Sequence, residues 1–348
     1  MNIHDFAESG KVSLRQIMDF TSDVNPIGPS NRAKHAIRKG AKDLVFPPDE
    51  KLRHLKRYLC KRERVEEDSV LFGQGVHHIL LALSRAVRPT TVALLPPASR
   101  RYREFLAGHN LEIANAPATK DWGSPIDIED FIKSAKDADM LVVANPHDLT
   151  GRTLPAGALI ALVEEMDRLD KTLVIDETYI EFTEAVSPLS RVVSSHGAMI
   201  IRSFSLFHAL AGLPIAYGIG PARLIEMVKS HVELPQISSL AALAAHASLK
   251  DKGYRKRTLQ FIAEEKKFII DGLKKLGRVD ATDTPCNFLV LKIDGAGAGL
   301  KTLLEKRTIM IDEYDDGNGN VWLKFPIKSH KFNARFIKAM KSVTEQSG

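Results

Sequence analysis

The sequence predicts a large α/β domain built on a mostly parallel sheet, followed by a smaller α+β domain. The first observation is that short apolar runs alternate with longer amphipathic stretches through the middle of the chain, which is typical of parallel strands covered by helices on both faces. The second is a change of pattern near residue 245, after which a long helical segment rich in lysine and glutamate begins. We therefore expect an N-terminal arm over residues 1–45, the large domain over 46–244 and the small domain over 245–348.

The short apolar runs predict the strands of the large sheet, because a strand buried on both faces reads as a continuous apolar run. Helix-like stretches at about 78–87, 128–135 and 156–169 separate several of these runs. The expected strands are Val70–Phe72, Thr91–Leu95, Met140–Ala144, Leu173–Ile175, Ala198–Ile201 and Ile215–Ile219.

The small domain is predicted from a different order of elements. A long helix over about 254–276 comes first, and a strand at 287–293 follows it. After that we expect a helix at 300–306, two short strands at 308–311 and 321–325, and a last helix over 330–343. Strands and helices mixed in this way are typical of an α+β domain.

The composition fits a large globular protein and excludes several function classes. The chain has 348 residues, of which 44% are hydrophobic, and this is ample for a large core. The net charge of +6 is spread along the chain, so we expect no nucleic-acid partner. We find no long apolar run and no signal-peptide pattern, so we expect no membrane span. Two distant cysteines, Cys60 and Cys286, give no disulfide framework and no metal spacing, which favours the reducing cytoplasm.

Polar motifs follow three of the predicted strands at the point where each strand ends. Residues 145–146 read Asn-Pro, residues 176–177 read Asp-Glu, and residues 202–203 read Arg-Ser. Ligands of open α/β sheets bind beyond the carboxyl ends of the strands. The sequence therefore predicts a ligand site assembled from loops that are distant in sequence.

Two segments resemble a known family. Residues 174–182 read Val-Ile-Asp-Glu-Thr-Tyr-Ile-Glu-Phe, and residues 19–28 read Asp-Phe-Thr-Ser-Asp-Val-Asn-Pro-Ile-Gly. Both are similar to segments of the class I/II aminotransferases, which are fold-type-I enzymes dependent on pyridoxal phosphate (PLP), in the branch of histidinol-phosphate aminotransferases and threonine-phosphate decarboxylases. The resemblance extends from about Asp19 to Val343. It implies an aspartate-aminotransferase-like large domain with a seven-stranded sheet and a dimeric assembly.

The resemblance implies roles for four matching residues. Asp176 would pair with the protonated pyridine nitrogen of PLP, and Tyr179 would donate to the phenolic oxygen of the ring. The alternative is that Asp176 caps the next helix and Tyr179 is an ordinary packed side chain. Asn25 and Lys324 would contact the substrate. Lys324 stands where the family has an arginine that clamps the substrate carboxylate, and lysine lacks the planar two-pronged donor.

The position of the catalytic lysine is the main departure from the family. Residues 202–217 resemble the family segment Ser-x-Ser/Thr-Lys, but Leu206 stands where the lysine binds PLP covalently and then acts as acid and base. There is no lysine between Lys171 and Lys229, so a shift of the lysine by one helical turn is excluded. Ser203 and Ser205 remain and could donate hydroxyl groups to the cofactor, or they could be turn residues.

Other contacts to PLP are also altered. Gly75 lies in a loop that resembles the phosphate-binding Gly-Asn-Gly segment, although the residues after it differ from those of the family. Asp148 replaces the asparagine that bonds the phenolic oxygen, and a carboxylate there would repel that oxygen unless it is protonated. Further changes stand at Pro214 for the phosphate arginine, Ser99 for the stacking aromatic, Phe46 for the tyrosine that reaches the neighbouring subunit, and Asp312 for an arginine.

Three hypotheses remain open at this point. The first is an inactive relative that binds a small anionic ligand, or that pairs with itself or with an active homologue. The second is an enzyme that holds PLP or pyridoxamine phosphate (PMP) without a covalent bond, for which His208 lies two residues from the lysine position. The third is different chemistry that uses Asp148, Asp176, Glu177 and His208. The cofactor is therefore none, or PLP or PMP by resemblance alone, and no metal site is expected.

Overall fold

The computed structural model describes residues 3–114, 122, 127–232, 237–293, 300–315 and 321–346. The backbone contacts divide the chain into two compact units. The large unit is Gly28–Tyr254, and the small unit combines Met1–Ile27 with Arg255–Gly348. None of the helices in the described part of the chain has the length and apolarity needed to cross a membrane.

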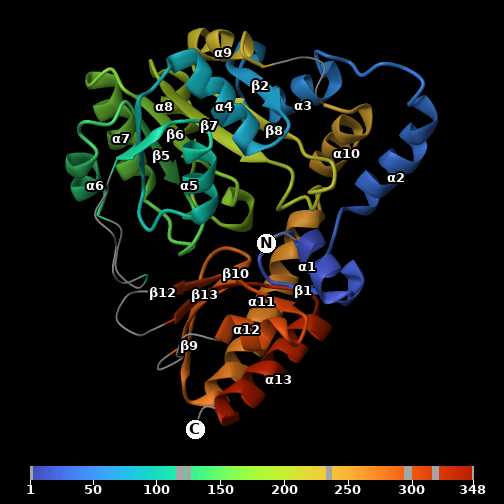
Figure 1. Ribbon diagram of the computed structural model, residues 1–348. Coiled ribbons are helices and arrows are strands. Elements are labelled where there is room, and N and C mark those ends of the chain that lie inside the picture. The colour runs from blue at the N-terminus through green and yellow to red at the C-terminus, as the bar shows by residue number, and fades with distance from the viewer. Residues whose placement is uncertain are drawn as a thin grey trace. The chain divides into compact units, whose positions relative to one another are not determined.

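The large unit contains the predicted seven-stranded, mostly parallel sheet (Figure 1). The strand order is β2-β8-β7-β6-β5-β3-β4, and only β8 runs antiparallel to its two neighbours. The predicted sheet is therefore confirmed, although β4 was not among the six expected strands. The strands are β2 Val70–Gly73, β3 Thr91–Leu94, β4 Glu112–Ala114, β5 Met140–Ala144, β6 Thr172–Asp176, β7 Ala198–Ser203 and β8 Ala216–Ile219.

Helices cover both faces of this sheet, because successive side chains of a strand point to opposite sides. In β6, Val174 packs into one apolar cluster, whereas Leu173 and Ile175 pack into the other. This pattern explains why the strands are apolar throughout. The helices are α2 Asn31–Gly40, α3 Arg53–Glu63, α4 Val76–Val87, α5 Arg100–Ala107, α6 Ile128–Ser134, α7 Ala156–Arg168, α8 Leu189–Val193, α9 Ala222–Lys229 and α10 Ser239–Leu249.

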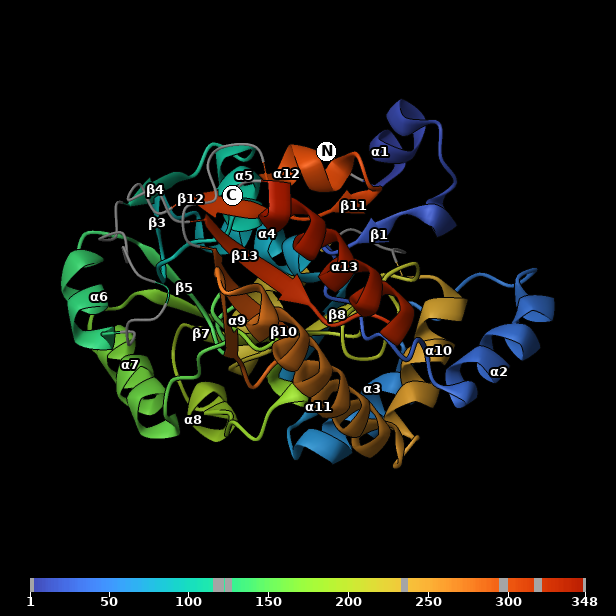
Figure 2. The same cartoon turned by 90° about the horizontal axis from the view of Figure 1, so that it is seen from below.

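The small unit has a four-stranded antiparallel sheet of order β12-β13-β10-β9 and a separate parallel pair, β1 with β11. Helices α11 and α13 lie side by side (Figure 2). A side chain at Gly272 of α11 would place its Cβ 2.7 Å from Ile337 of α13, so glycine permits this close approach. The elements are α1 Ile3–Gly10, β1 Met18–Asp19, α11 Tyr254–Leu273, β9 Val279–Asp283, β10 Phe288–Ile293, α12 Leu300–Glu305, β11 Ile309–Met310, β12 Glu313–Asp315, β13 Val321–Pro326 and α13 His330–Gln346.

The two units do not begin and end at the predicted domain boundaries. Residues 18–19 form β1, which pairs with residues 309–310, and this pairing draws the N-terminal residues into the small unit. Helices α2 and α10 pack on each other within the large unit, so the division falls after Tyr254. The arm over 1–45 and the domains over 46–244 and 245–348 remain a prediction.

Candidate functional site

The carboxylate of Asp176, at the carboxyl end of β6, is held by two side chains of the large unit. Oδ1 accepts the backbone N–H of Thr178 at 2.8 Å and also the Thr178 hydroxyl. Oδ2 accepts the phenol of Tyr102, which lies on α5. Asp176 is 7% exposed. Both carboxylate oxygens therefore have donors from the protein itself.

The electrostatics of this group favour a neutral phenol beside Asp176. Burial raises the pKa of Asp176 and the neighbouring Asp148 adds to this, while hydrogen bonds from Thr178 and Tyr102 act in the opposite direction. Burial, followed by the charge of Asp176, raises the pKa of the Tyr102 phenol well above its ordinary value. Tyr102 therefore stays protonated, and its hydroxyl donates a hydrogen bond to the carboxylate.

A small cavity lies beside Tyr102. The cavity there has a volume of about 10 Å³, which is roughly the volume that a single water-sized sphere needs. Ser99 lies on its wall and acts as the N-cap of α5, because its hydroxyl accepts the N–H of Tyr102 at 3.5 Å. The lining residues are Leu94, Leu95, Ala98, Ser99, Tyr102, Val142, Ala144 and Asp148.

The loop before α4 uses part of its own hydrogen-bonding capacity internally. The N–H of Gln74 donates to Nδ1 of His78 at 3.0 Å, and the N–H of Gly75 donates to the carbonyl of Gly73 at 2.9 Å. Gly75 has φ +97°, a conformation that favours glycine. Two amides that could bind an anion in the predicted phosphate loop are therefore already engaged.

The turn after β7 contains the predicted Ser203, Ser205 and Leu206. Oγ of Ser203 accepts the N–H of Ser205 at 3.0 Å, a turn contact that leaves the Ser203 hydroxyl proton available to another acceptor. Leu206 is half-buried, and its carbonyl accepts the N–H of Ala209 at 3.2 Å. Tyr179 is buried beyond β6, where its ring lies 6.3 Å from that of Phe182.

Asp148 lines the small cavity, next to the buried His147. Nδ1 of His147 accepts the N–H groups of Leu149 and Thr150 at 3.2 and 3.3 Å. A ring nitrogen that accepts these bonds carries no proton. Although Oδ1 of Asp148 lies 3.8 Å from this nitrogen, the two groups are therefore not an ion pair in this arrangement.

Glu177 takes part in a different network from that of Asp176. Its Oε2 accepts Nε of Arg202 at 2.8 Å, and Nη1 of Arg202 donates to Glu63 at 2.7 Å. Burial raises the pKa of Glu177, although Arg202 opposes the shift. Glu63 was missed in the sequence because it lies 139 residues from Arg202 and belongs to no motif.

His208, the proposed lysine substitute, lies beside Glu181. Its Nε2 is 3.0 Å from Oε2 of Glu181. Burial alone would raise the pKa of Glu181, but the charges of His208, Arg62 and Arg202 outweigh it and lower the pKa to about 2. His208 therefore has a carboxylate partner of its own, in a network separate from Asp176.

The two predicted substrate residues belong to the small unit and have partners within it. Asn25 donates to the hydroxyl of Thr258 at 2.9 Å. Nζ of Lys324 lies 2.7 Å from Oδ2 of Asp23 and 4.5 Å from the ring centroid of Phe288. Lys324, which was expected to bind the carboxylate of a substrate, is thus paired with the carboxylate of Asp23.

Replacing Tyr102 by phenylalanine tests the strength of the bond to Asp176. We expect the free energy of unfolding to fall by about 1–3 kcal/mol, because a buried carboxylate oxygen loses its donor. The pKa of Asp176 rises further in this variant, since the Tyr102 bond lowers it. Urea denaturation measures the loss. Tyr58→Phe is the matched control, because Tyr58 forms a longer bond, of 3.5 Å, to a backbone carbonyl; an equal loss in both variants contradicts the prediction.

Comparison with known proteins identifies relatives over nearly the whole chain. The family model for "Aminotransferase class I and II" matches residues 15–314. Histidinol-phosphate aminotransferase 2 of Carboxydothermus hydrogenoformans is 25% identical over 342 residues, covering 96% of this chain and 93% of the relative. The crystal structure of the histidinol-phosphate aminotransferase from Clostridium acetobutylicum is 26% identical, with a TM-score of 0.84, and the match covers 95% of this chain and 100% of that one.

A second solved structure has the same fold at lower identity. The L-threonine-O-3-phosphate decarboxylase from Porphyromonas gingivalis is 21% identical, with a TM-score of 0.78. The match covers 94% of this chain and 100% of that chain. The fold is therefore shared across both types of relative that the sequence resembles.

Proposed function

Because the chain belongs to the class I and II aminotransferase family, we propose that it is a member without transaminase activity, which acts as a binding or partner protein. The observation that carries the proposal is the state of Asp176. Its two oxygens accept from Tyr102 and Thr178, and the cavity beside Tyr102 has a volume of about 10 Å³. A pyridinium N–H at Asp176 would have to share the carboxylate with these donors or displace one of them. The described residues around Asp176 therefore already engage the carboxylate that PLP would need.

Three further features support the proposal. Leu206 has no amine with which to bind PLP or to move a proton at a substrate carbon. Gln74 and Gly75 donate their N–H groups within the loop that resembles the phosphate site. Pro214 offers no charge where the family has a phosphate-binding arginine. Each change removes a different kind of contact, so loss of the whole cofactor site explains them together.

Addition of PLP to the purified protein tests the proposal. We expect no visible absorption band from a lysine–PLP adduct, and no added mass after borohydride reduction. An active histidinol-phosphate aminotransferase treated in parallel is the positive control. A borohydride-fixed adduct on a single lysine of the folded protein contradicts the proposal. PMP binding by calorimetry that is lost in Asp176→Ala also contradicts it, and favours an enzyme that holds the cofactor without a covalent bond.

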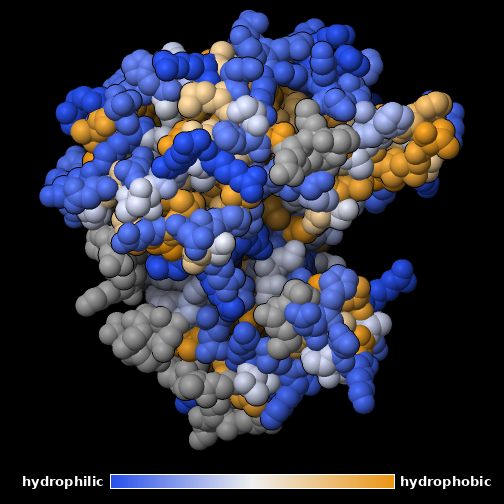
Figure 3. Space-filling model, turned by 45° about the horizontal axis from the view of Figure 1, so that its top comes forward, coloured by the Kyte–Doolittle hydropathy of each residue, from blue (hydrophilic) through white to orange (hydrophobic). Residues whose placement is uncertain are grey.

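We propose further that the protein works as a homodimer, or as the partner of an active homologue, in the cytoplasm. Leu44, Val45 and Phe46 are 58%, 81% and 67% exposed, and consecutive exposed apolar side chains are typical of an interface. Apolar surface gathers on the side of the large unit that carries α2 and the segment after it (Figure 3). Cys60 and Cys286 are buried free thiols, which is consistent with a reducing compartment.

The exposed apolar segment gives a prediction about assembly. We expect the double variant Val45→Asp/Phe46→Asp to shift the protein from dimer to monomer, because two charges in an apolar interface would lose their hydration. Sedimentation velocity measures the shift. Val186→Asp is the control, since Val186 is also 66% exposed but lies outside this segment. A monomeric parent protein, alone and when mixed with an active homologue, contradicts both forms of the proposal.

A further inference from the structure

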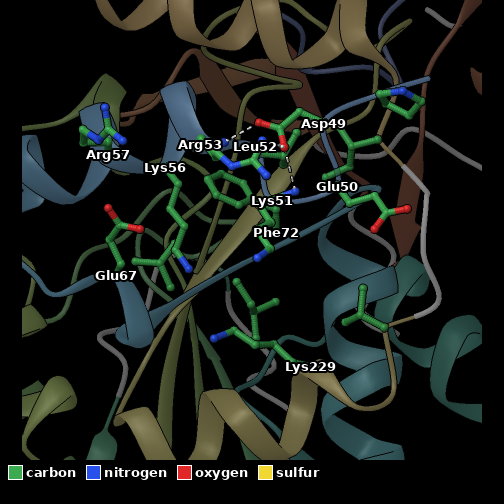
Figure 4. Close-up of a pocket in the computed structure, with 15 residues that line it drawn as sticks. Asp49, Glu50, Lys51, Leu52, Arg53, Lys56, Arg57, Glu67, Phe72 and Lys229 are labelled. Atoms are coloured by element: carbon green, nitrogen blue, oxygen red, sulfur yellow. Dashed lines mark hydrogen bonds and ion pairs between the residues drawn. The ribbon is translucent and has the colours of Figure 1, made fainter. Parts of the chain in front are cut away.

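A second pocket of the large unit, with a volume of about 540 Å³, lies at the β2 edge of the sheet (Figure 4). Its walls come from the segment before α3, from α3, from β2 and from the end of α9. Strands β8 and β7 separate β2 from β6, the strand that carries Asp176. None of the residues predicted to bind a cofactor or substrate lines this pocket.

The pocket combines an apolar wall with an excess of positive charge. Leu52, Val70, Phe72, Val232 and Ile237 supply apolar surface. The charged lining comprises five lysines and arginines but only three carboxylates. A volume of this size lies within the range of roughly 300–1,000 Å³ that is usual for small-molecule sites.

Two cations of the pocket are available to a ligand. The amino group of Lys56 forms neither a hydrogen bond nor an ion pair with any residue in the described ranges. Among the described residues Lys229 pairs with Glu226 alone, at 3.8 Å, and the side chain of Glu226 is 81% exposed, so solvent weakens this pair. The amino groups of Lys56 and Lys229 point into the same part of the pocket (Figure 4). Burial and the charge of Lys229 both lower the pKa of Lys56, so an anion between the two amines would relieve their repulsion.

The carboxylates of the lining do not cancel this charge. Asp49 is committed to Arg53, whose Nη1 lies 3.0 Å from its Oδ1. Glu67 attracts Lys56 electrostatically but forms no ion pair with it in the described structure. Lys56 and Lys229 therefore repel each other in a lining that carries more positive than negative charges.

We propose that this pocket binds a small organic anion with an apolar body, whose phosphate or carboxylate lies between Lys56 and Lys229 while the body packs on Phe72 and Val232. This chemistry distinguishes the ligand from inorganic phosphate, which has no apolar part. The inference goes beyond the loss of transamination, since the pocket shares no residue with the Asp176 site. PLP addition tests that loss, whereas calorimetry with organic anions tests this pocket, so either proposal can fail alone.

Calorimetry with phenyl phosphate and benzoate on the full-length protein tests the pocket. We expect at least one of them to bind more tightly than inorganic phosphate or benzyl alcohol, which carry only the charge or only the apolar body. The preferred probe shows whether the site favours a phosphate or a carboxylate. Absence of binding by both organic anions, or equally tight binding of inorganic phosphate, overturns the proposal.

Single substitutions assign the binding to this pocket. Lys56→Gln and Lys229→Gln should each lower the affinity for the probe about tenfold, which is the effect of roughly one charge-assisted hydrogen bond. Val232→Asp should also lower the affinity for the probe, because it removes apolar surface from the wall and adds a negative charge that repels the anion. Lys61→Gln is the matched control, since Lys61 is exposed on the same helix and does not line the pocket. Unchanged binding in Lys56→Gln, or an equal loss in Lys61→Gln, overturns the assignment.

Discussion

Replacing Arg202 by leucine is expected to lower the free energy of unfolding by about 3–5 kcal/mol, the range for breaking a buried ion pair from one side. The side chain of Arg202 is 11% exposed, and its partners Glu177 and Glu63 are 0% and 13% exposed. Leucine would fill part of the space but leave the buried Glu177 without its cation, while Glu63 would keep, among the described residues, only Arg62 at 3.6 Å. Guanidinium denaturation followed by circular dichroism measures the loss.

The pH dependence of this variant has a defined sign. The pKa of Glu177 is already raised above 4.5 by burial, and it rises further without Arg202. Between pH 4.5 and the raised pKa, Glu177 of the folded variant is protonated, whereas Glu177 of the unfolded chain is ionised. The stability of the variant therefore falls as pH increases through this window. We expect the deficit relative to the parent protein to be smaller in mild acid than at neutral pH.

A surface pair provides the control for this prediction. Arg168 bonds Glu165 at 2.6 Å, but its side chain is 66% exposed. Arg168→Leu should therefore change the stability by about 0–1 kcal/mol. If Arg202→Leu destabilises the protein no more than Arg168→Leu does, the buried network does not have the energetic role assigned to it.

Restoring lysine with Leu206→Lys is expected to leave transaminase activity at background. Aminotransferase catalysis has to accelerate its reaction by roughly 10⁶-fold or more, and an amine without a positioned cofactor supplies almost none of this. Asp176 would still be engaged by Tyr102, and Pro214 would still stand where the family has an arginine for the phosphate. A coupled assay with histidinol phosphate and 2-oxoglutarate, in the presence of added PLP, measures the activity.

Leu206→Met is the matched control, because methionine has a similar volume and no amine. We expect the lysine and methionine variants to be equally inactive with histidinol phosphate and with ordinary amino donors. Recovery of activity in Leu206→Lys alone would contradict the proposal, because it would mean that the surrounding changes are compatible with a working cofactor site.

Much of the large unit could be predicted from its apolar runs. The strand expected at Met140–Ala144 has those bounds in the structure, because both of its faces are buried and no polar residue interrupts it. Strand β4 could not be predicted in this way. It is a short edge strand whose first residue, Glu112, is exposed, so it lacks the continuous apolar run. The pairing of β1 with β11 could not be predicted from the sequence either, because it joins two-residue strands from opposite ends of the chain.

The candidate site was predictable in its location but not in its contacts. The polar strand ends pointed to Asp176, and the family resemblance supplied a role for it. The bond from Tyr102 to Asp176 joins residues that are 74 positions apart. No periodicity or spacing encodes such a contact, because it depends on how α5 is placed over the end of β6.

The end of β6 also carries two independent hydrogen-bonding networks. Asp176 and Glu177 are neighbours in sequence, yet their partners do not overlap: one bonds Tyr102 and Thr178, the other Arg202. A substitution at Asp176 therefore removes no donor from Glu177. What Asp176 binds can be altered without weakening the Glu177–Arg202 pair that stabilises the large unit.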